Sequence, residues 1–173
     1  MKNTNKEGHS KPYKKLQTKK TLEEILDIAI SFEKTARDFY TALIPNVSKN
    51  IRYLVEELAE EEQQHFDLFT SLKENSEVKK QLVKKINTPV DDHKFSDFVK
   101  LVDLGDNPDD QTILIYALAR EDAAMKQYRD LAENAPKGEL KDTFSFLAIE
   151  EAEHKLELEK KYYEIIHSGG PGM

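Results

Sequence analysis

One pattern of leucine, acidic and histidine residues occurs twice in the chain. Residues 58–65 read LAEEEQQH and residues 147–154 read LAIEEAEH, so both segments follow L-A-x-E-E-x-x-H. In an α-helix, a Glu and a His three residues apart lie on the same face. Carboxylate oxygen and imidazole nitrogen together are a ligand set that suits Fe(II) or Mn(II). Each segment therefore offers a metal one such pair: Glu62 with His65, and Glu151 with His154.

Two further glutamates interrupt helical stripes that are otherwise apolar or aromatic. The residues around Glu33 are of the same types, in the same order, as those around Glu121, 88 residues later. The two matching sets are Ala29, Glu33, Ala36, Tyr40 and Leu43, and Ala117, Glu121, Ala124, Tyr128 and Leu131. The halves of the chain therefore read as two copies of one helical hairpin.

The four glutamates would be costly to bury together. Carboxylates brought into one layer repel one another and lose their hydration, and the stripes themselves contain no Lys or Arg that would offset the charge. Two divalent cations would balance four carboxylates, so the pattern predicts a dinuclear metal site. Its six expected ligands are Glu33, Glu62, His65, Glu121, Glu151 and His154. The alternative is an ordinary charged bundle in which each E-x-x-H is a solvated pair.

The composition favours helices throughout. Charged residues make up 34% of the 173 residues and hydrophobic ones 38%, with only 6 Gly and 6 Pro, which indicates an all-α chain of long amphipathic helices. There is no cysteine, which excludes disulfides, iron–sulfur clusters and thiolate metal sites.

Capping and breaking residues divide the chain into four long helices and one crossover. Thr21 caps a helix over 21–44, and Ser48 caps a second that ends near Glu74. Residues 75–107 form the crossover, with a small helix somewhere in 95–104. Asn107 caps a third helix that begins at Pro108 and ends near Glu133, and the fourth helix covers 139–166. This order predicts a four-helix bundle over 21–166, between a flexible Lys-rich arm at 1–20 and a flexible tail at 167–173.

The charge distribution limits the partners. Residues 1–20 hold seven Lys and one Glu, so the formal net charge of −7 leaves about −13 on residues 21–173. An acidic body is a poor match for nucleic acid. No apolar run has the length of a membrane span and no secretory signal precedes the bundle, so we expect a cytoplasmic protein with no membrane partner.

The arrangement resembles the ferritin-like di-iron carboxylate superfamily, and most of all the di-iron domain of rubrerythrins. The resemblance is carried by IAISFEKTARDFYTAL, by LAEEEQQHFDLF and by the second E-x-x-H. It implies a ferritin-like fold in which Glu62 and Glu151 bridge two Fe ions, with Mn or a mixed pair as alternatives. Glu33 and Glu121 would be terminal ligands, and His65 and His154 would bind one ion each. Tyr40 and Tyr128 match tyrosines near the family's site, although both also suit core aromatics with a bonded hydroxyl.

The same resemblance implies a function, and the chain differs from the family in two ways that bear on it. It implies an oxidoreductase that acts as a peroxidase and reduces hydrogen peroxide or dioxygen. It also implies a homodimer. Rubrerythrins also carry a rubredoxin domain with four Cys, which this chain lacks, so the electrons would come from a separate donor protein. They further tend to have a Glu where this chain has Ala124. The alternatives are a ferroxidase that handles iron and a non-catalytic metal-binding bundle.

Overall fold

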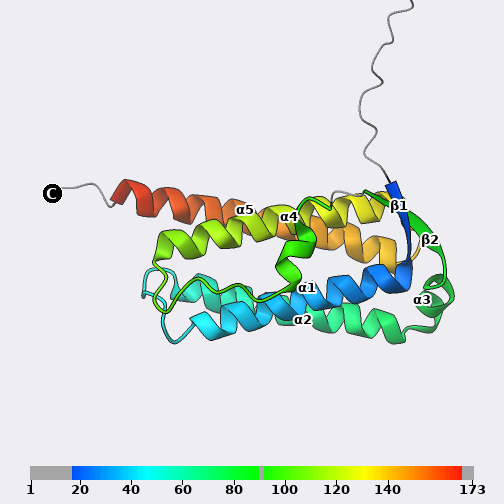
Figure 1. Ribbon diagram of the computed structural model, residues 1–173, viewed down its shortest axis with the longest axis horizontal. Helices are drawn as coiled ribbons and strands as arrows, with labels where there is room; N and C mark the ends of the chain where they lie inside the picture. The colour runs from blue at the N-terminus through cyan, green and yellow to red at the C-terminus, as the bar shows by residue number, and fades with distance from the viewer. Residues whose placement is uncertain (1–16, 90–91, 169–173) are drawn as a thin grey trace, which may run out of the picture.

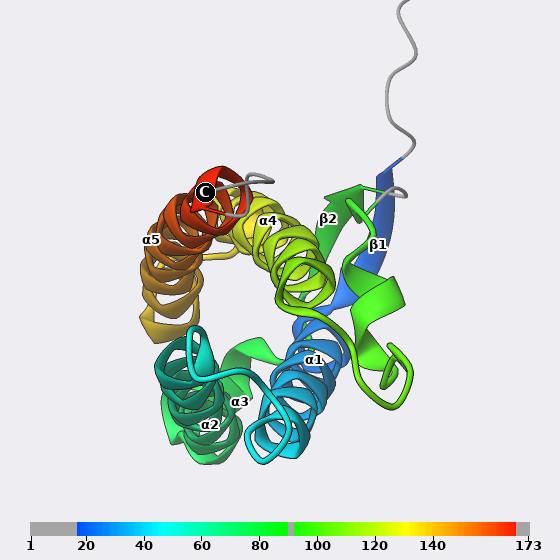
Figure 2. The ribbon, with the colours of Figure 1, turned by 90° about the vertical axis from the view of Figure 1, so that its left-hand side faces the viewer.

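Four long helices form the body of the protein. The computed structural model describes residues 17–89 and 92–168, and its long helices are α1 (Leu22–Leu43), α2 (Arg52–Glu74), α4 (Asp110–Asn134) and α5 (Glu139–Ser168). Helix α1 packs along α2 and α4 packs along α5, and the end-on view shows the four helices around one axis (Figures 1 and 2). The expected all-α, ferritin-like bundle is confirmed.

The crossover between the hairpins is more structured than the sequence suggested. It contains the short helix α3 (Ser76–Gln81), the strand β2 (Lys85–Pro89) and the 3₁₀ helix η1 (Phe95–Val99). Helix α3 was not expected, although Asn75 is a good cap: its side chain accepts hydrogen bonds from the backbone N–H groups of Glu77 and Val78. The helix expected within 95–104 is the 3₁₀ turn, and its Phe95 ring stacks on Phe32 of α1 with ring centroids 3.9 Å apart.

One of the three expected helix caps is present in the structure, and two are not. Thr21 caps α1 as expected, since its hydroxyl accepts from the N–H of Glu24. The expectation for Ser48 is wrong: its hydroxyl accepts from the N–H of Asn50 within a turn, and α2 starts only at Arg52. Asn107 does not cap α4 either. The helix begins at Asp110, two residues later than expected, and Asp109 caps it. The Oδ1 atom of Asp109 accepts a hydrogen bond from the backbone nitrogen of Thr112 at 2.7 Å.

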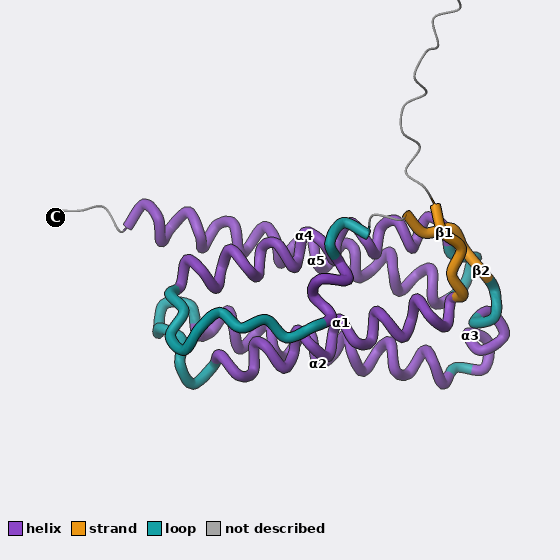
Figure 3. The backbone as a smooth tube through the Cα atoms, in the orientation of Figure 1, coloured by secondary structure: helices purple, strands orange, loops and turns teal. Residues whose placement is uncertain are grey.

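The end of the expected arm is a β-strand. Gln17–Thr21 forms β1, which pairs antiparallel with β2 from Gln17 opposite Pro89 to Thr21 opposite Lys85 (Figure 3). The prediction of a flexible arm over 1–20 is therefore wrong for residues 17–20, because β1 finds its backbone partners in the crossover, 64 to 72 residues later in the chain. Residues 1–16 lie outside the described part of the chain. At the other end, the expected tail at 167–173 is wrong for residues 167 and 168, which continue α5. Residues 169–173 lie outside the described part of the chain.

The apolar core is divided into two clusters. One lies toward the strands and includes Phe32, Phe69 and Phe144. The other lies toward the α1–α2 turn and includes Phe39 and Ile51. On each long helix, a buried Glu or a buried Glu–His pair separates the residues of one cluster from those of the other, which makes six such residues in all. Among the described residues, no helix combines the length and the apolar character that crossing a bilayer requires.

Candidate metal centre

The six expected ligands meet in one buried layer. Helix α1 supplies Glu33, α4 supplies Glu121, and α2 and α5 each supply a Glu–His pair. The four glutamates are fully buried, and His65 and His154 are only 3% and 8% exposed. Ligand atoms fall into two groups of four, each within 4.8 Å of one another: Glu33, Glu62, His65 and Glu151, and Glu62, Glu121, Glu151 and His154. Glu62 and Glu151 belong to both groups, the arrangement that two bridging carboxylates require.

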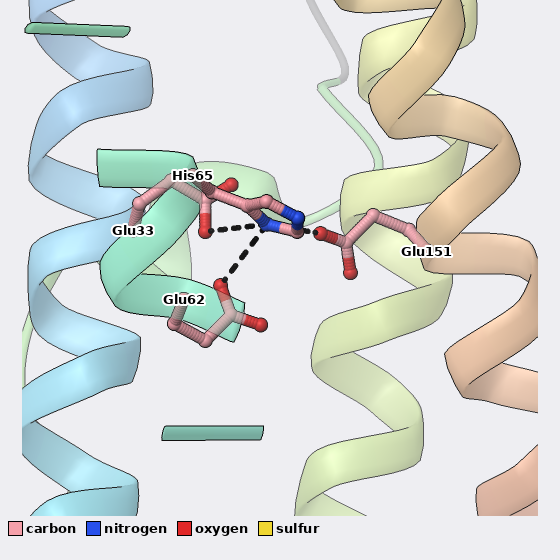
Figure 4. Close-up of side chains that lie close together, drawn as sticks. All are labelled: Glu33, Glu62, His65 and Glu151. Carbon is pink, nitrogen blue, oxygen red and sulfur yellow. Dashed lines mark ion pairs between the residues drawn. The ribbon is translucent and has the colours of Figure 1, made fainter. Parts of the chain in front are cut away.

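The first group is arranged around the Nδ1 atom of His65. This nitrogen lies 3.2 Å from Glu151 Oε1, 3.6 Å from Glu33 Oε2 and 3.7 Å from Glu62 Oε2 (Figure 4). Side chains from α1, α2 and α5 therefore point at one small volume. The i, i+3 spacing on α2 directs Glu62 and His65 there from one helix face.

The second group repeats this arrangement around His154. Its Nδ1 atom lies 3.7 Å from both Glu121 Oε2 and Glu151 Oε2. The two imidazole rings are nearly parallel, with centroids 6.1 Å apart. Glu151 thus turns one oxygen toward each histidine, which places it between the two groups.

Each histidine is held from outside by the opposite helix. His65 Nε2 lies 2.6 Å from Glu150 Oε2 of α5, and His154 Nε2 contacts Glu61 Oε2 of α2. A carboxylate on the outer nitrogen orients an imidazole and leaves its other nitrogen for a metal. Sequence reasoning assigned no role to Glu61 and Glu150. The signal was present, because each is the first acid of the doubled E-E in the repeated pattern.

Several polar atoms of the layer are buried without a hydrogen-bond partner. They are Glu33 Oε2, His65 Nδ1, Glu121 Oε2, both carboxylate oxygens of Glu151, and His154 Nδ1. Buried polar atoms are nearly always satisfied in native proteins, so a cluster of unsatisfied ligand atoms needs an explanation. Divalent cations between these atoms would satisfy all of them, and the donor set fits such ions.

The pKa shifts in the layer reflect burial and the crowding of carboxylates. Burial, followed by the neighbouring Glu62, raises the pKa of Glu33 well above its usual value. Burial alone would lower the pKa of His154, but the nearby carboxylates of Glu151 and Glu61 outweigh it and raise the pKa to about 10. Both shifts favour the forms with less negative or more positive charge, as a crowd of buried carboxylates would.

The two tyrosines differ in their contacts. The hydroxyl of Tyr128 donates a short hydrogen bond to Glu33 Oε1, and burial raises the pKa of this phenol. The Tyr40 hydroxyl is buried and has no hydrogen-bond partner. Tyr128 thus touches an expected ligand directly, whereas Tyr40 does not hydrogen-bond to one. A catalytic role for either stays a prediction.

The stripes contain no Lys or Arg, as expected, but a buried arginine beside the stripe of α4 does offset the charge of the carboxylates. The side chain of Arg120 is 1% exposed, and its Nη1 atom lies 3.1 Å from Glu62 Oε1 and 3.2 Å from Glu121 Oε1. Its positive charge lowers the pKa of Glu62, although burial of that carboxyl acts in the opposite direction. Arg120 was missed because it directly precedes Glu121 and so lies about 100° away around the helix, off the stripe that defined the inward face.

Comparison with known proteins agrees with this site. The Rubrerythrin family model matches residues 24–101, which contain most of α1, all of α2 and most of the crossover, with Glu33, Glu62 and His65. Searches of curated proteins and of solved structures found no match. The match confirms the resemblance to rubrerythrin di-iron domains and, with the Glu–His cluster, supports a metal-binding site in this layer.

Proposed function

Because residues 24–101 are rubrerythrin-like, we propose that the protein is a di-iron oxidoreductase that reduces hydrogen peroxide, or less efficiently dioxygen, with electrons from a donor protein. One observation carries the proposal: two groups of buried carboxylate and imidazole atoms share Glu62 and Glu151 and leave their inner atoms unsatisfied. A pair of redox-active ions is the occupant that this shape and donor set suit best.

The ligand roles follow from the grouping. Glu62 and Glu151 would bridge two Fe ions, Glu33 and Glu121 would each bind one ion, and His65 and His154 would do the same on their own sides. Manganese or a mixed pair fits the same donors. When bound, two Fe(II) ions supply the two electrons that convert hydrogen peroxide and two protons into two water molecules.

The remaining residues of the layer orient these ligands and control protons and solvent. Glu150 and Glu61 hold the imidazoles so that Nδ1 faces inward. Tyr128 keeps a proton on its hydroxyl, directed at Glu33, because burial and the adjacent carboxylate raise its pKa. Apolar clusters on both sides of the layer limit access of bulk water and escape of reactive products.

The test is to load the protein with Fe(II) under anaerobic conditions and mix it rapidly with hydrogen peroxide or with dioxygen. We expect the ferric absorbance to develop faster with peroxide and the iron to stay bound through several cycles of reduction and oxidation. Glu151→Ala, which removes a carboxylate shared by both groups, should abolish the signal. Equal inertness toward both oxidants in the iron-loaded protein would contradict an enzymatic role and favour a non-catalytic metal-binding bundle.

Rapid reaction with dioxygen followed by release of ferric iron would instead identify a ferroxidase. The expected homodimer and the separate electron-donor protein stay predictions. Sedimentation of the full chain tests the first. Reduction of the ferric protein by a candidate redox protein tests the second.

A further inference from the structure

Among the described residues, Arg120 is the one buried side chain of the layer with a permanent positive charge. Its guanidinium Nη1 lies 3.1 Å from Glu62 Oε1 and 3.2 Å from Glu121 Oε1, and Nη2 lies 3.2 Å from Glu62 Oε2 and 3.5 Å from Glu33 Oε2. Three of the four expected carboxylate ligands therefore touch it.

The contacts of Arg120 make the two shared carboxylates unequal. Both oxygens of Glu62 bond to the guanidinium, while both oxygens of Glu151 have no hydrogen-bond partner. The internal repeat explains the difference, because the residue 88 positions before Arg120 is Phe32. The guanidinium carbon lies 4.2 Å from the centre of the Phe32 ring, so a cation in one half of the repeat stacks on an aromatic residue in the other.

The contacts of Arg120 have a consequence for metal binding. The guanidinium bonds to both oxygens of Glu62 and to one oxygen of Glu121, which are oxygens that divalent cations in this layer would also need. Like charges close together in a buried layer repel one another strongly. The guanidinium therefore stabilises these carboxylates in the metal-free layer and opposes the binding of cations to them.

We propose that Arg120 is an internal competitor for metal. Its guanidinium holds Glu62 in the metal-free protein, and it weakens the binding of divalent cations that need the same carboxylates. The bundle can then fold before it acquires metal, and the metal remains exchangeable. This proposal rests on the proposed metal site, and Arg120 acts in it as a positioning residue.

The competitor role predicts two effects of opposite sign. Replacing Arg120 by an uncharged residue should destabilise the metal-free protein, because it leaves buried carboxylates unpaired, and should tighten metal binding, because it frees Glu62 and removes a positive charge. A purely structural arginine would act differently: its loss would weaken the fold and the metal site together. The sign of the change in metal affinity separates the two roles.

Four variants of the full chain make the comparison. Arg120→Met removes the charge and keeps an unbranched side chain against Phe32. Arg120→Gln is a second neutral variant that can still donate a hydrogen bond to Glu62. Arg120→Lys keeps the charge without the two-pronged contact. Arg129→Met is the matched control, because Arg129 is exposed on the same helix.

The measurement is a titration of each metal-free protein with Mn²⁺, in which free Mn²⁺ is read by its EPR signal, together with thermal unfolding without metal. In Arg120→Met we expect an unfolding midpoint lower by about 5 °C or more and Mn²⁺ binding tighter by about 10-fold or more. Arg120→Gln should shift in the same directions. Arg120→Lys should stay within about 3-fold of the wild-type affinity because it keeps the charge, and Arg129→Met should match the wild type in both measurements.

Two results would overturn the inference, and they are distinguishable from failure of the proposed function. If the wild type binds Mn²⁺ and the neutral variants bind it equally or more weakly, Arg120 supports the ligands and does not compete with metal. If the wild type binds neither Mn²⁺ nor anaerobic Fe²⁺, the metal site itself is wrong and both proposals fall. If the Met variant folds only with Mn²⁺, the affinity of the Gln variant decides: tighter binding supports the competitor role, and equal or weaker binding overturns it.

Discussion

His65 and Glu150 are joined across the interface between α2 and α5, with Nε2 and Oε2 2.6 Å apart. The partner pair, His154 and Glu61, repeats the contact in the opposite direction. Each helix of this pair therefore supplies a histidine to the layer and a carboxylate that orients the other helix's histidine. This exchange gives the doubled acid in L-A-x-E-E-x-x-H a physical role: the second Glu faces the metal layer, and the first holds the opposite imidazole.

Removing an orienting carboxylate should weaken metal binding without removing a ligand. For Glu150→Ala or Glu61→Ala we expect about 10- to 100-fold weaker binding of Mn²⁺, because the freed imidazole loses its fixed orientation. Equilibrium dialysis measures the change. Glu153→Ala is the control on α5, since this exposed Glu precedes His154 and makes no ion pair in the described part of the chain. Equal loss of affinity in the control would remove the special role of Glu150.

Loss of a shared carboxylate should remove most of the iron. The loaded protein should hold about two Fe per chain, and Glu62→Ala or Glu151→Ala should reduce this to a small fraction, because each belongs to both ligand groups. Metal analysis after anaerobic loading and desalting gives the occupancy. Glu157→Ala, at an exposed position of α5, should retain full occupancy. A fully loaded Glu151→Ala protein would show that the ligand assignment is wrong.

Metal removal should lower the thermal stability at neutral pH. Bound cations satisfy buried atoms such as Glu121 Oε2 and His154 Nδ1, which otherwise have no hydrogen-bond partner. A ligand at 100 times its dissociation constant stabilises the folded state by about 2.7 kcal/mol. Calorimetry with and without a chelator measures the shift in the unfolding midpoint. A chelated protein that unfolds no earlier than the loaded one would contradict a metal site in this layer.

A glutamate at position 124 tests the departure from rubrerythrins. Ala124 is fully buried on α4, three residues beyond Glu121, so a Glu side chain there would lie beside the metal layer. We expect Ala124→Glu to destabilise the metal-free protein and to increase the preference of the iron-loaded protein for peroxide over dioxygen. Stopped-flow rates with each oxidant measure the preference. Ala119→Glu, at an exposed position of the same helix, should change neither property, and unchanged rates in Ala124→Glu would show that residue 124 does not reach the metals.

The start of α4 should depend on the carboxylate of Asp109. Its hydrogen bonds with Thr112 lower its pKa, so the charged form is favoured in the folded protein. A depressed pKa means that the contribution of this cap is present at neutral pH and is lost as the pH falls below about 4. Asp109→Ala should lower the unfolding midpoint at pH 7, and by less as the pH falls through the lowered pKa of Asp109, whereas Asp109→Asn should retain most of the cap. Asn107→Ala is the control, and an equal effect at residue 107 would restore Asn107 as the cap.

The sequence by itself determined the four long helices and the inward direction of six polar side chains. Helical periodicity is local, so Glu33, Glu121 and the two E-x-x-H pairs could be assigned to core-facing stripes from their spacing alone. The internal repeat then indicated that equivalent residues from both halves would meet. The structure brings all six into one layer, as that spacing predicted.

Only the tertiary structure decided which charges surround that layer. Arg120 lies off the stripe of α4, and its long side chain reaches Glu62 of α2 because the two helices pack in one bundle. The contact of Glu150 with His65 likewise depends on how α5 lies against α2, and the pairing of β1 with β2 depends on where the crossover returns. Periodicity reports which way a side chain leaves its own helix. It carries no information about which distant side chain or strand meets it, because that choice is made by packing between elements far apart in the chain.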